Sequence, residues 1–581
     1  MLKKWCICHK YSLIFILFLV CFYGYSISRV YGFIFFPDEF GYWTYAAKGA
    51  GYDWSEIVSL GSYYSYGYSL ILFPIFKLCT DSVTAYRVAV TLNFALIGVA
   101  YFLLLFIAQK LWNKKKKKRV ALFAAIAVFY PSWLFYAKTT MVETMLMVTF
   151  VVICALLYDY LEKNKLSTLV LFVVALVYIH FLHMRAVGIL IAGGVTLFVY
   201  FMLQNGKAKQ LLVAAAMGIT VLLGGFLIKE VIQNMFYASA GKNMLGINDY
   251  AGQFEKIAYI FTKEGMADLI CGLAGKVLYL GLASFGLAYW GMWYAAKEVW
   301  KLGRQIRKKE ERDVKKLFYL FVILSTIGET LINAIYNIRP IRIDSVTYGR
   351  YHEFVLPILM LFGLYEISKT RKPITGTILV TLIQLPMVPL VLYSVNKYQL
   401  TNFHGYIMVG MSYLHNLEEF EPSRFYWTTY VFLAAVSIFV AVIVRIACRK
   451  GYEVVLVWLI VLEFLLSARA SVNYIEDSSH GAYRDTIIVD KIESLQEENP
   501  ERRVVYIRED DSPFISIIQF MMRDEKITLV TAKEKVEEYT EKEMDENDII
   551  LLKFDSLYAE KMTTKYSNYL LHGHFYIFYN P

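Results

Sequence analysis

Long apolar blocks recur along most of this chain, separated by short polar gaps. Clear examples are 120–137, 141–158, 186–203 and 426–447. A helix needs about 20 apolar residues to cross the hydrocarbon core of a bilayer. The pattern therefore predicts a multi-pass α-helical membrane protein with about 13 transmembrane helices. The expected spans are 11–31, 83–109, 120–137, 141–161, 167–183, 186–204, 210–229, 269–297, 317–337, 351–369, 374–394, 426–447 and 452–469.

One apolar stretch, 66–79, is too short to cross comfortably. Counting it as a span would place the basic run 114–119 outside the cell, against the usual distribution of Lys and Arg. We therefore predict an interfacial or re-entrant helix here, lying under the first external loop.

Composition agrees with a membrane protein, since 57% of the 581 residues are hydrophobic and only 19% are charged. The net charge of +10 lies mainly in the gaps between apolar blocks, which indicates membrane topology rather than nucleic-acid binding. The seven cysteines show neither a disulfide framework nor zinc-ligand spacing. We expect a cell-membrane protein with a cytoplasmic N-terminus and an extracytoplasmic C-terminus.

The composition changes near residue 470, where charged residues become dense. Short strand-like runs at 504–507, 527–531, 549–552 and 575–578 alternate with helical stretches at 514–522 and 532–543. This alternation predicts a small extracytoplasmic α/β domain over 471–581, after a transmembrane domain over 1–470. We expect this tail to help recognise the molecule on which the membrane domain acts, or to position partners.

The first external loop carries an adjacent acidic pair, Asp38 and Glu39, directly after a predicted span and among aromatic residues. Ionisable groups at the membrane surface are costly and often functional. The alternative interpretation is a pair of solvated loop carboxylates, because this dipeptide is common.

The context of the pair resembles the GT-C superfamily of membrane glycosyltransferases, which use lipid-phosphate-linked sugars. Protein O-mannosyltransferases and the bacterial transferase that adds aminoarabinose to lipid A are examples. The acidic pair is followed by a helical stretch at 42–48 and a Tyr/Gly/Pro-containing stretch at 66–74. Later come Lys138 and Glu143 in a second external turn, an Arg–Gly element at 185–188, and the Arg-Tyr…Pro element 350–357. The resemblance covers residues 11–470.

The resemblance implies inverting transfer of a sugar from a polyprenyl-phosphate donor to an acceptor hydroxyl at the outer membrane face. Asp38 would be the general base, Glu39 would orient the acceptor or support Asp38, and Glu143 would assist. Arg185 and Arg350 would hold the donor phosphate with their fork-like donors, and Lys138 would add a point charge.

Aromatic and imidazole groups would line the donor and acceptor pocket. The expected pocket residues are Tyr42, Tyr66, Tyr351 and His352. The cofactor is undecided: no cofactor, or a divalent cation (Mg²⁺ or Mn²⁺) on Asp38 and Glu143. The expected partners are the polyprenyl-phosphate-linked sugar, membrane lipids, and an acceptor that is a polymer, glycolipid or protein.

Other interpretations stay open. Arg185 and Arg350 are also placed to snorkel at span ends. The chain as a whole is alternatively a transporter or flippase of lipid-linked saccharides, or a non-catalytic cell-envelope scaffold. Transporters tend to carry inverted repeats and charges at mid-bilayer, and neither is evident in the sequence. The sequence names neither the sugar nor the acceptor.

Overall fold

The computed structural model describes residues 2–35, 38–58, 65–112, 117–204, 207–237, 251–308, 313–415, 420–509, 514–531 and 545–581. Within these ranges nine helices are long and apolar enough to cross a membrane. They are Ser82–Leu111, Glu143–Lys163, Met184–Leu203, Ala208–Ile232, Lys263–Ala283, Val314–Tyr336, Pro373–Lys397, Pro422–Lys450 and Glu453–Glu498. Shorter apolar helices include Tyr11–Ile27 and Leu166–Leu182. The chain is a multi-pass membrane protein, and the predicted number of 13 spans is not confirmed.

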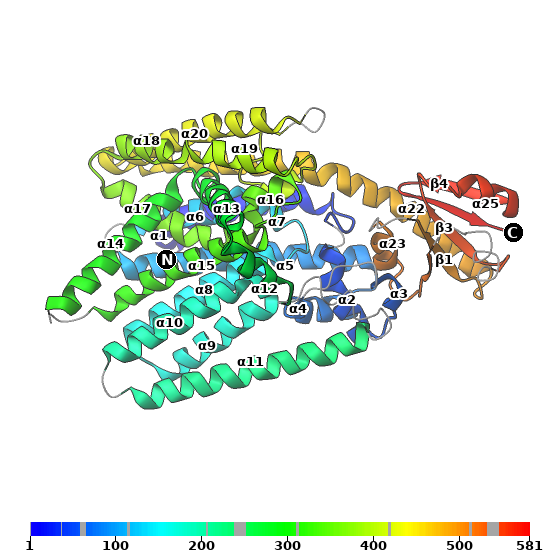
Figure 1. Cartoon of the computed structure of the whole chain (residues 1–581), viewed down its shortest axis with the longest axis horizontal. Helices are drawn as coiled ribbons and strands as arrows, with labels where there is room; N and C mark the ends of the chain where they lie inside the picture. The colour runs from blue at the N-terminus through cyan, green and yellow to red at the C-terminus, as the bar shows by residue number, and fades with distance from the viewer. Residues whose placement is uncertain are drawn as a thin grey trace.

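The helical bundle forms the larger part of the molecule, and most of its helices run side by side along the long axis (Figure 1). Its N-terminal helices are α1 (Leu2–Ile27), α5 (Ser82–Leu111), α6 (Lys117–Val128), α7 (Pro131–Tyr136), α8 (Glu143–Lys163), α9 (Leu166–Leu182), α10 (Val187–Leu203) and α11 (Ala208–Tyr237). The later ones are α12 (Ala251–Ile260), α13 (Lys263–Ala283), α14 (Leu287–Lys308), α15 (Leu317–Tyr336), α16 (Ile343–Thr347), α17 (Leu356–Lys369), α18 (Pro373–Gln384), α19 (Met387–Lys397), α20 (Pro422–Lys450) and α21 (Val457–Ser471).

Three predicted spans are interrupted, which corrects their prediction as single helices. Span 120–137 is divided into α6 and α7 before Pro131, because proline has no N–H to continue the α6 ladder. Span 269–297 is divided into α13 and α14 at Phe285 and Gly286, whose φ angles of 54° and 77° are left-handed. Span 374–394 is divided into α18 and α19 at Pro386.

A separate group of short helices lies at the end of the bundle nearest the sheet: α2 (Asp38–Ala50), α3 (Ser55–Val58) and α4 (Ser69–Leu78) (Figure 1). Helix α4 packs against α2, with the Ser69 hydroxyl donating to the Tyr42 carbonyl at 2.6 Å. Helix α4 is short, as expected for 66–79, and its depth in a membrane stays a prediction.

The C-terminal part is a five-stranded sheet with the order β2-β1-β3-β5-β4. Its strands are β1 (Val504–Arg508), β2 (Thr528–Thr531), β3 (Ile549–Lys553), β4 (Asn568–His572) and β5 (Phe575–Tyr579). The first three are parallel, and the β4–β5 hairpin is antiparallel to β3. The small α/β domain and four of its strands are thus confirmed. Strand β4 and helix α25 (Ala559–Lys565) had not been predicted, and the expected helix 532–543 lies outside the described residues.

A continuous helical segment joins the two parts. Helix α21 passes through a π-helical turn (Val472–Glu476) into α22 (Asp477–Glu498), which reaches the sheet (Figure 1). The helix therefore crosses the predicted boundary at residue 470, and that boundary stays a prediction.

The sheet domain also docks on the short helices through α23 (Ile515–Met521), which lies between β1 and β2 in sequence. The fully buried Phe520 ring lies 4.3 Å from the ring of Phe33 and 5.1 Å from that of Trp43. Just beyond the helix, Arg523 Nη1 donates to the Cys79 carbonyl at 2.8 Å. The C-terminal domain is therefore packed directly against the helix that begins with Asp38.

We predict that Phe520→Ala destabilises this docking by about 3–5 kcal/mol, because it removes a buried aromatic side chain and leaves a cavity. Thermal unfolding of the detergent-solubilised protein would measure the loss. Leu557→Ala is the control, since Leu557 is 91% exposed in the same domain. Equal stability of the two variants would contradict the prediction.

Candidate active site

Arg350 joins two carboxylates that are distant in sequence. Its Nη1 lies 2.6 Å from Asp38 Oδ2, and its Nε lies 2.5 Å from Glu143 Oε1. Asp38 begins α2 and Glu143 begins α8, so both acids lie in the first turn of a helix, where the backbone dipole favours negative charge. The same Glu143 oxygen accepts from Arg185 Nη2 at 2.8 Å. Four of the predicted residues, Asp38, Glu143, Arg185 and Arg350, therefore form one ion-pair cluster.

An unusual backbone turn directs Arg350 inward. Tyr348 has φ 35° and ψ 64°, a left-handed conformation that is uncommon for a residue with a side chain. The following residue has to be glycine, because a Cβ on Gly349 would lie 1.9 Å from the Tyr279 ring. Strained turns of this kind concentrate at functional sites.

Arg185 is held on the other side of Glu143 in a 3-10 turn, Met184–Ala186. The His183 Nδ1 atom accepts from the Arg185 backbone N–H at 3.3 Å, and the Arg185 guanidinium lies 4.5 Å from the centre of the Tyr351 ring. Its Nε and Nη1 atoms are buried and have no hydrogen-bond partner among the described residues. These two donors are available to an anionic ligand, and a planar guanidinium suits phosphate.

The two acids of the cluster, Asp38 and Glu143, differ in their exposure to solvent. The Asp38 side chain is 23% exposed, whereas those of Glu143 and Arg350 are 6% and 4% exposed. Asp38 is thus the carboxylate of the cluster that an incoming group can reach. The Tyr42 ring is buried beside the cluster, and burial, together with the nearby charge of Glu143, raises its pKa well above the usual value.

Glu39 faces a different environment from its neighbour. One carboxylate oxygen accepts from the backbone N–H groups of Ile34 and Phe35, at 2.7 and 2.8 Å. The other accepts from the Tyr86 hydroxyl at 2.6 Å and from both the N–H and the hydroxyl of Thr140, at 2.6 and 2.7 Å. Burial raises the pKa of Glu39, although these hydrogen bonds oppose the shift. Glu39 thereby fixes the start of α2 to α5 and to the turn before α8.

Three predicted residues lie away from the cluster's ion pairs. The Lys138 ammonium donates to Ser471 Oγ at 2.8 Å, in a separate pocket. The Tyr66 hydroxyl donates to the Gly225 carbonyl of α11 at 3.1 Å. His352 Nδ1 lies 2.6 Å from Asn333 Nδ2, behind the turn that carries Arg350.

Sequence reasoning missed the residues that support the cluster, chiefly Tyr86, Thr140, Tyr279 and Tyr348. The Tyr348-Gly349 step was the one available signal, because a glycine directly before a candidate Arg indicates a constrained turn. Tyr86, Thr140 and Tyr279 lie in or beside apolar blocks and carry no local signal.

A divalent cation fits the arrangement poorly. Among the described residues no group of three or more His, Cys, Asp or Glu side chains is placed to hold a metal ion. The two expected ligands, Asp38 and Glu143, both pair with Arg350, which already supplies positive charge between them. The dependence on Mg²⁺ or Mn²⁺ stays a prediction, which a chelator and metal-addition assay would test.

The predicted fold, a multi-pass helical bundle with a small C-terminal sheet domain, is confirmed by its similarity to solved structures. It is similar to the crystal structure of ArnT from Cupriavidus metallidurans bound to undecaprenyl phosphate, with a TM-score of 0.53 and 13% identity over 98% of each chain. The apo state of that protein gives a TM-score of 0.51 and 14% identity, over 98% of this chain and 97% of that one. At such identity the similarity shows the fold. The sequence matches no family model and no curated protein.

We predict that Glu143→Gln lowers the free energy of unfolding by about 3–5 kcal/mol, because it leaves two buried guanidinium groups without their shared counter-charge. The matched control is Glu162→Gln, which breaks a partly exposed ion pair with Lys110 and is expected to cost about 0–1 kcal/mol. Thermal unfolding in detergent would compare them. Similar losses in both variants would show that the cluster is not an electrostatic unit.

Proposed function

We propose that this protein transfers a sugar from a polyprenyl-phosphate donor to an acceptor hydroxyl at the outer face of the membrane. The observation that carries the proposal is the Asp38–Arg350–Glu143–Arg185 cluster, in a chain with the fold of ArnT. One of the two ArnT structures contains undecaprenyl phosphate, a polyprenyl phosphate like the leaving group of the proposed reaction.

Arg185 and Arg350 supply the positive charge for the donor phosphate. The two unpartnered nitrogen atoms of Arg185 would donate to its oxygens, and Glu143 would hold the two guanidinium groups side by side. As the glycosidic C–O bond breaks, the electron pair remains on the phosphate oxygen, and preorganised donors stabilise that developing charge. The leaving group is the polyprenyl phosphate itself.

Asp38 is placed to act as the general base. It would take the proton of the acceptor hydroxyl while that oxygen attacks the anomeric carbon on the face opposite the phosphate, so that the configuration inverts. Its partial exposure lets an acceptor approach, and its ion pair with Arg350 holds the carboxylate in place. Glu39, whose oxygens are already occupied by hydrogen bonds, fixes the helix that carries Asp38.

We predict that Asp38→Asn lowers kcat by about 100- to 10,000-fold, since the amide cannot accept the proton. Purified wild type and variant would be assayed with a panel of radiolabelled polyprenyl-phosphate sugars and membrane extracts as acceptors. The control is Asp53→Asn, in the same external loop, where the side chain is 47% exposed and caps a short turn that Asn also caps. A folded Asp38→Asn variant with wild-type activity would remove Asp38 from the mechanism. If wild type transfers none of the labelled sugars, the transferase proposal loses to the transporter or scaffold alternatives.

Arg185→Lys tests the phosphate contact, because it keeps the charge but removes the planar fork. We expect KM for the donor to rise about ten-fold or more, in line with the loss of a charge-assisted hydrogen bond. The control is Arg339→Lys, an exposed position in the loop before Arg350. A rise in KM of the same size in both variants would contradict a specific role for Arg185.

A further inference from the structure

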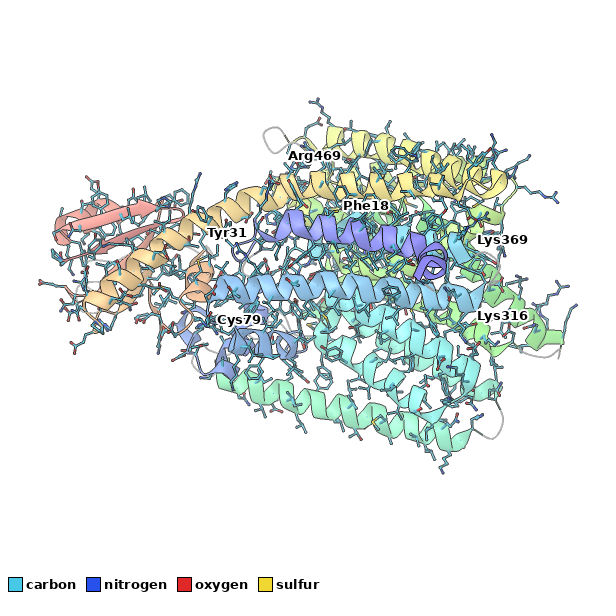
Figure 2. All side chains as sticks on the ribbon, turned by 180° about the vertical axis from the view of Figure 1, so that it is seen from behind. Phe18, Tyr31, Cys79, Lys316, Lys369 and Arg469 are labelled. Atoms are coloured by element: carbon cyan, nitrogen blue, oxygen red, sulfur yellow. The ribbon has the colours of Figure 1, made fainter. Side chains whose placement is uncertain are left out.

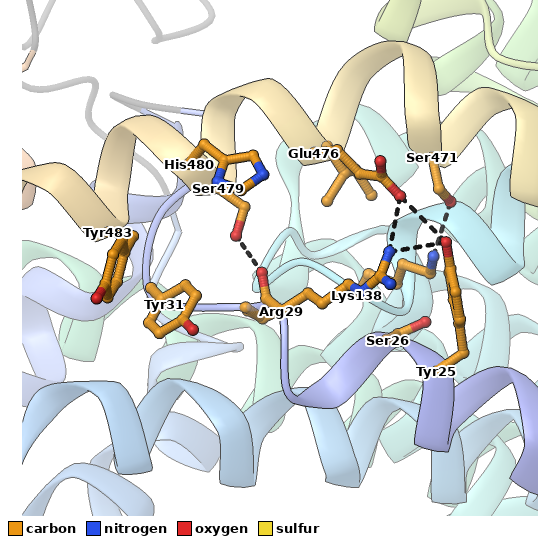
Figure 3. A pocket seen from close by; sticks show the side chains of 12 residues that line it. Tyr25, Ser26, Arg29, Tyr31, Lys138, Ser471, Glu476, Ser479, His480 and Tyr483 are labelled. Atoms are coloured by element: carbon orange, nitrogen blue, oxygen red, sulfur yellow. Dashed lines mark hydrogen bonds and ion pairs between the residues drawn. The ribbon is translucent and has the colours of Figure 1, made fainter.

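A pocket of about 450 Å³, which contains charged side chains, lies outside the Asp38–Arg350 cluster. It opens between the C-terminal end of α1, the turn 137–142 and the helical segment α21–α22 (Figure 3). The lining residues are Tyr25, Ser26, Arg29, Val30, Tyr31, Lys138, Ser471, Ile475, Glu476, Ser479, His480 and Tyr483. None of them belongs to the cluster, so the pocket is a separate site.

Lys138 is the buried cation of this pocket. Only 3% of the residue is exposed, and its ammonium lies over the Phe22 ring at 4.4 Å. An ammonium has three N–H donors, and within the described chain Lys138 makes one hydrogen bond, to Ser471, and no ion pair. Burial lowers the pKa of Lys138 to about 7, and the nearby charge of Glu476 offsets this shift only in part. An anion bound in the pocket would stabilise the protonated ammonium.

Arg29 adds a second positive charge at the pocket mouth. Its Nη1 lies 2.9 Å from the Tyr25 hydroxyl and 3.3 Å from Glu476 Oε1 (Figure 3). The side chains of Arg29 and Glu476 are 55% and 32% exposed, and an ion pair between side chains this exposed is weak. When Lys138 is protonated, it and Arg29 are two cations facing one carboxylate, Glu476, in the pocket. Arg29 can therefore turn toward an anion at low cost.

The position of the pocket indicates where the anion comes from. Helices α1 and α21 lie side by side, with the Phe22 and Phe464 rings 5.2 Å apart (Figure 2). Their outer surfaces carry exposed apolar side chains such as Leu17 (62%) and Leu465 (58%), which suit contact with lipid tails. Tyr25, Tyr31 and Tyr483 surround the mouth, as aromatic residues do at the headgroup level of a bilayer.

We propose that this pocket binds the phosphate headgroup of an anionic membrane lipid, at a site separate from the donor site. Lys138 and Arg29 hold the phosphate oxygens, while the Lys138 ammonium keeps its hydrogen bond to Ser471. Glu476 and His480 face the remainder of the headgroup.

The pocket is also connected to the proposed active site through one short turn. Lys138 is followed by Thr140, which holds Glu39, and by Glu143, which pairs both arginines. A lipid bound on Lys138 therefore stabilises the segment that positions the catalytic cluster.

The test uses delipidated full-length protein in detergent, with phosphatidylglycerol or phosphatidylcholine added back. We expect phosphatidylglycerol, but not phosphatidylcholine, to raise the Tm and to stay bound in native mass spectrometry. Lys138→Gln should weaken the apparent affinity about ten-fold, whereas Lys138→Arg should keep most of it. Lys77→Gln, at an exposed lysine of α4, should behave as wild type.

Several outcomes would overturn the proposal. Equal stabilisation by both lipids, or by phosphatidylglycerol in wild type and Lys138→Gln alike, would exclude a Lys138 lipid site. The same Tm gain with sodium phosphate alone would assign the pocket to free phosphate. If undecaprenyl phosphate displaced phosphatidylglycerol and required Lys138, the pocket would belong to the donor. If Lys138→Gln failed to fold, Arg29→Gln at the exposed rim would decide, because it must also weaken phosphatidylglycerol binding.

These measurements need no transfer activity, so the lipid proposal and the proposed function fail separately. A protein without transferase activity that still bound phosphatidylglycerol through Lys138 would retain the lipid site and lose the function. A protein that transfers the sugar but does not bind phosphatidylglycerol would retain the function and lose the lipid site.

Discussion

The buried guanidinium of Arg350 is the interaction on which the arrangement of the site depends. Asp38 and Glu143 begin two different helices, and two carboxylates this close would repel each other without a cation between them. Arg350 removes that repulsion. Its guanidinium can itself be buried because the ion pairs with both acids compensate for its lost hydration. The segments that carry Asp38, Glu143 and Arg350 lie more than a hundred residues apart in the sequence, and these ion pairs hold them together.

The adjacent acids Asp38 and Glu39 show how a site and its support can share one short sequence. Successive residues on a helix point about 100° apart, so the two carboxylates meet different surroundings. Asp38 faces Arg350 and the surface, while Glu39 is enclosed by donors from the preceding loop, α5 and the turn before α8. The hydrogen bonds of Glu39 hold the start of the helix in place, and Asp38 stays accessible beside it. A general base needs both properties, because it has to be fixed while a substrate can still reach it.

The features that could be predicted from the sequence are those with a local signature. Apolar blocks of bilayer length and short apolar runs typical of strands are visible residue by residue, and both parts of the fold follow from them. Helix breaks inside apolar blocks are harder to see, since Phe285-Gly286 leaves the hydropathy of its block almost unchanged. The partners of the charged residues depend on tertiary packing. Arg185 and Arg350, grouped by the family resemblance, pair with the same Glu143 oxygen, whereas Lys138 faces another pocket because the short α7 redirects the chain just before it.

The helical segment Glu453–Glu498 behaves as a rigid spacer. At 1.5 Å per residue its 46 residues extend for about 69 Å, and α23 fixes the sheet at a second point on the short helices. Two attachments prevent the sheet from swinging about either one. The distance of the sheet from the far end of the bundle is consequently a built-in dimension of the molecule.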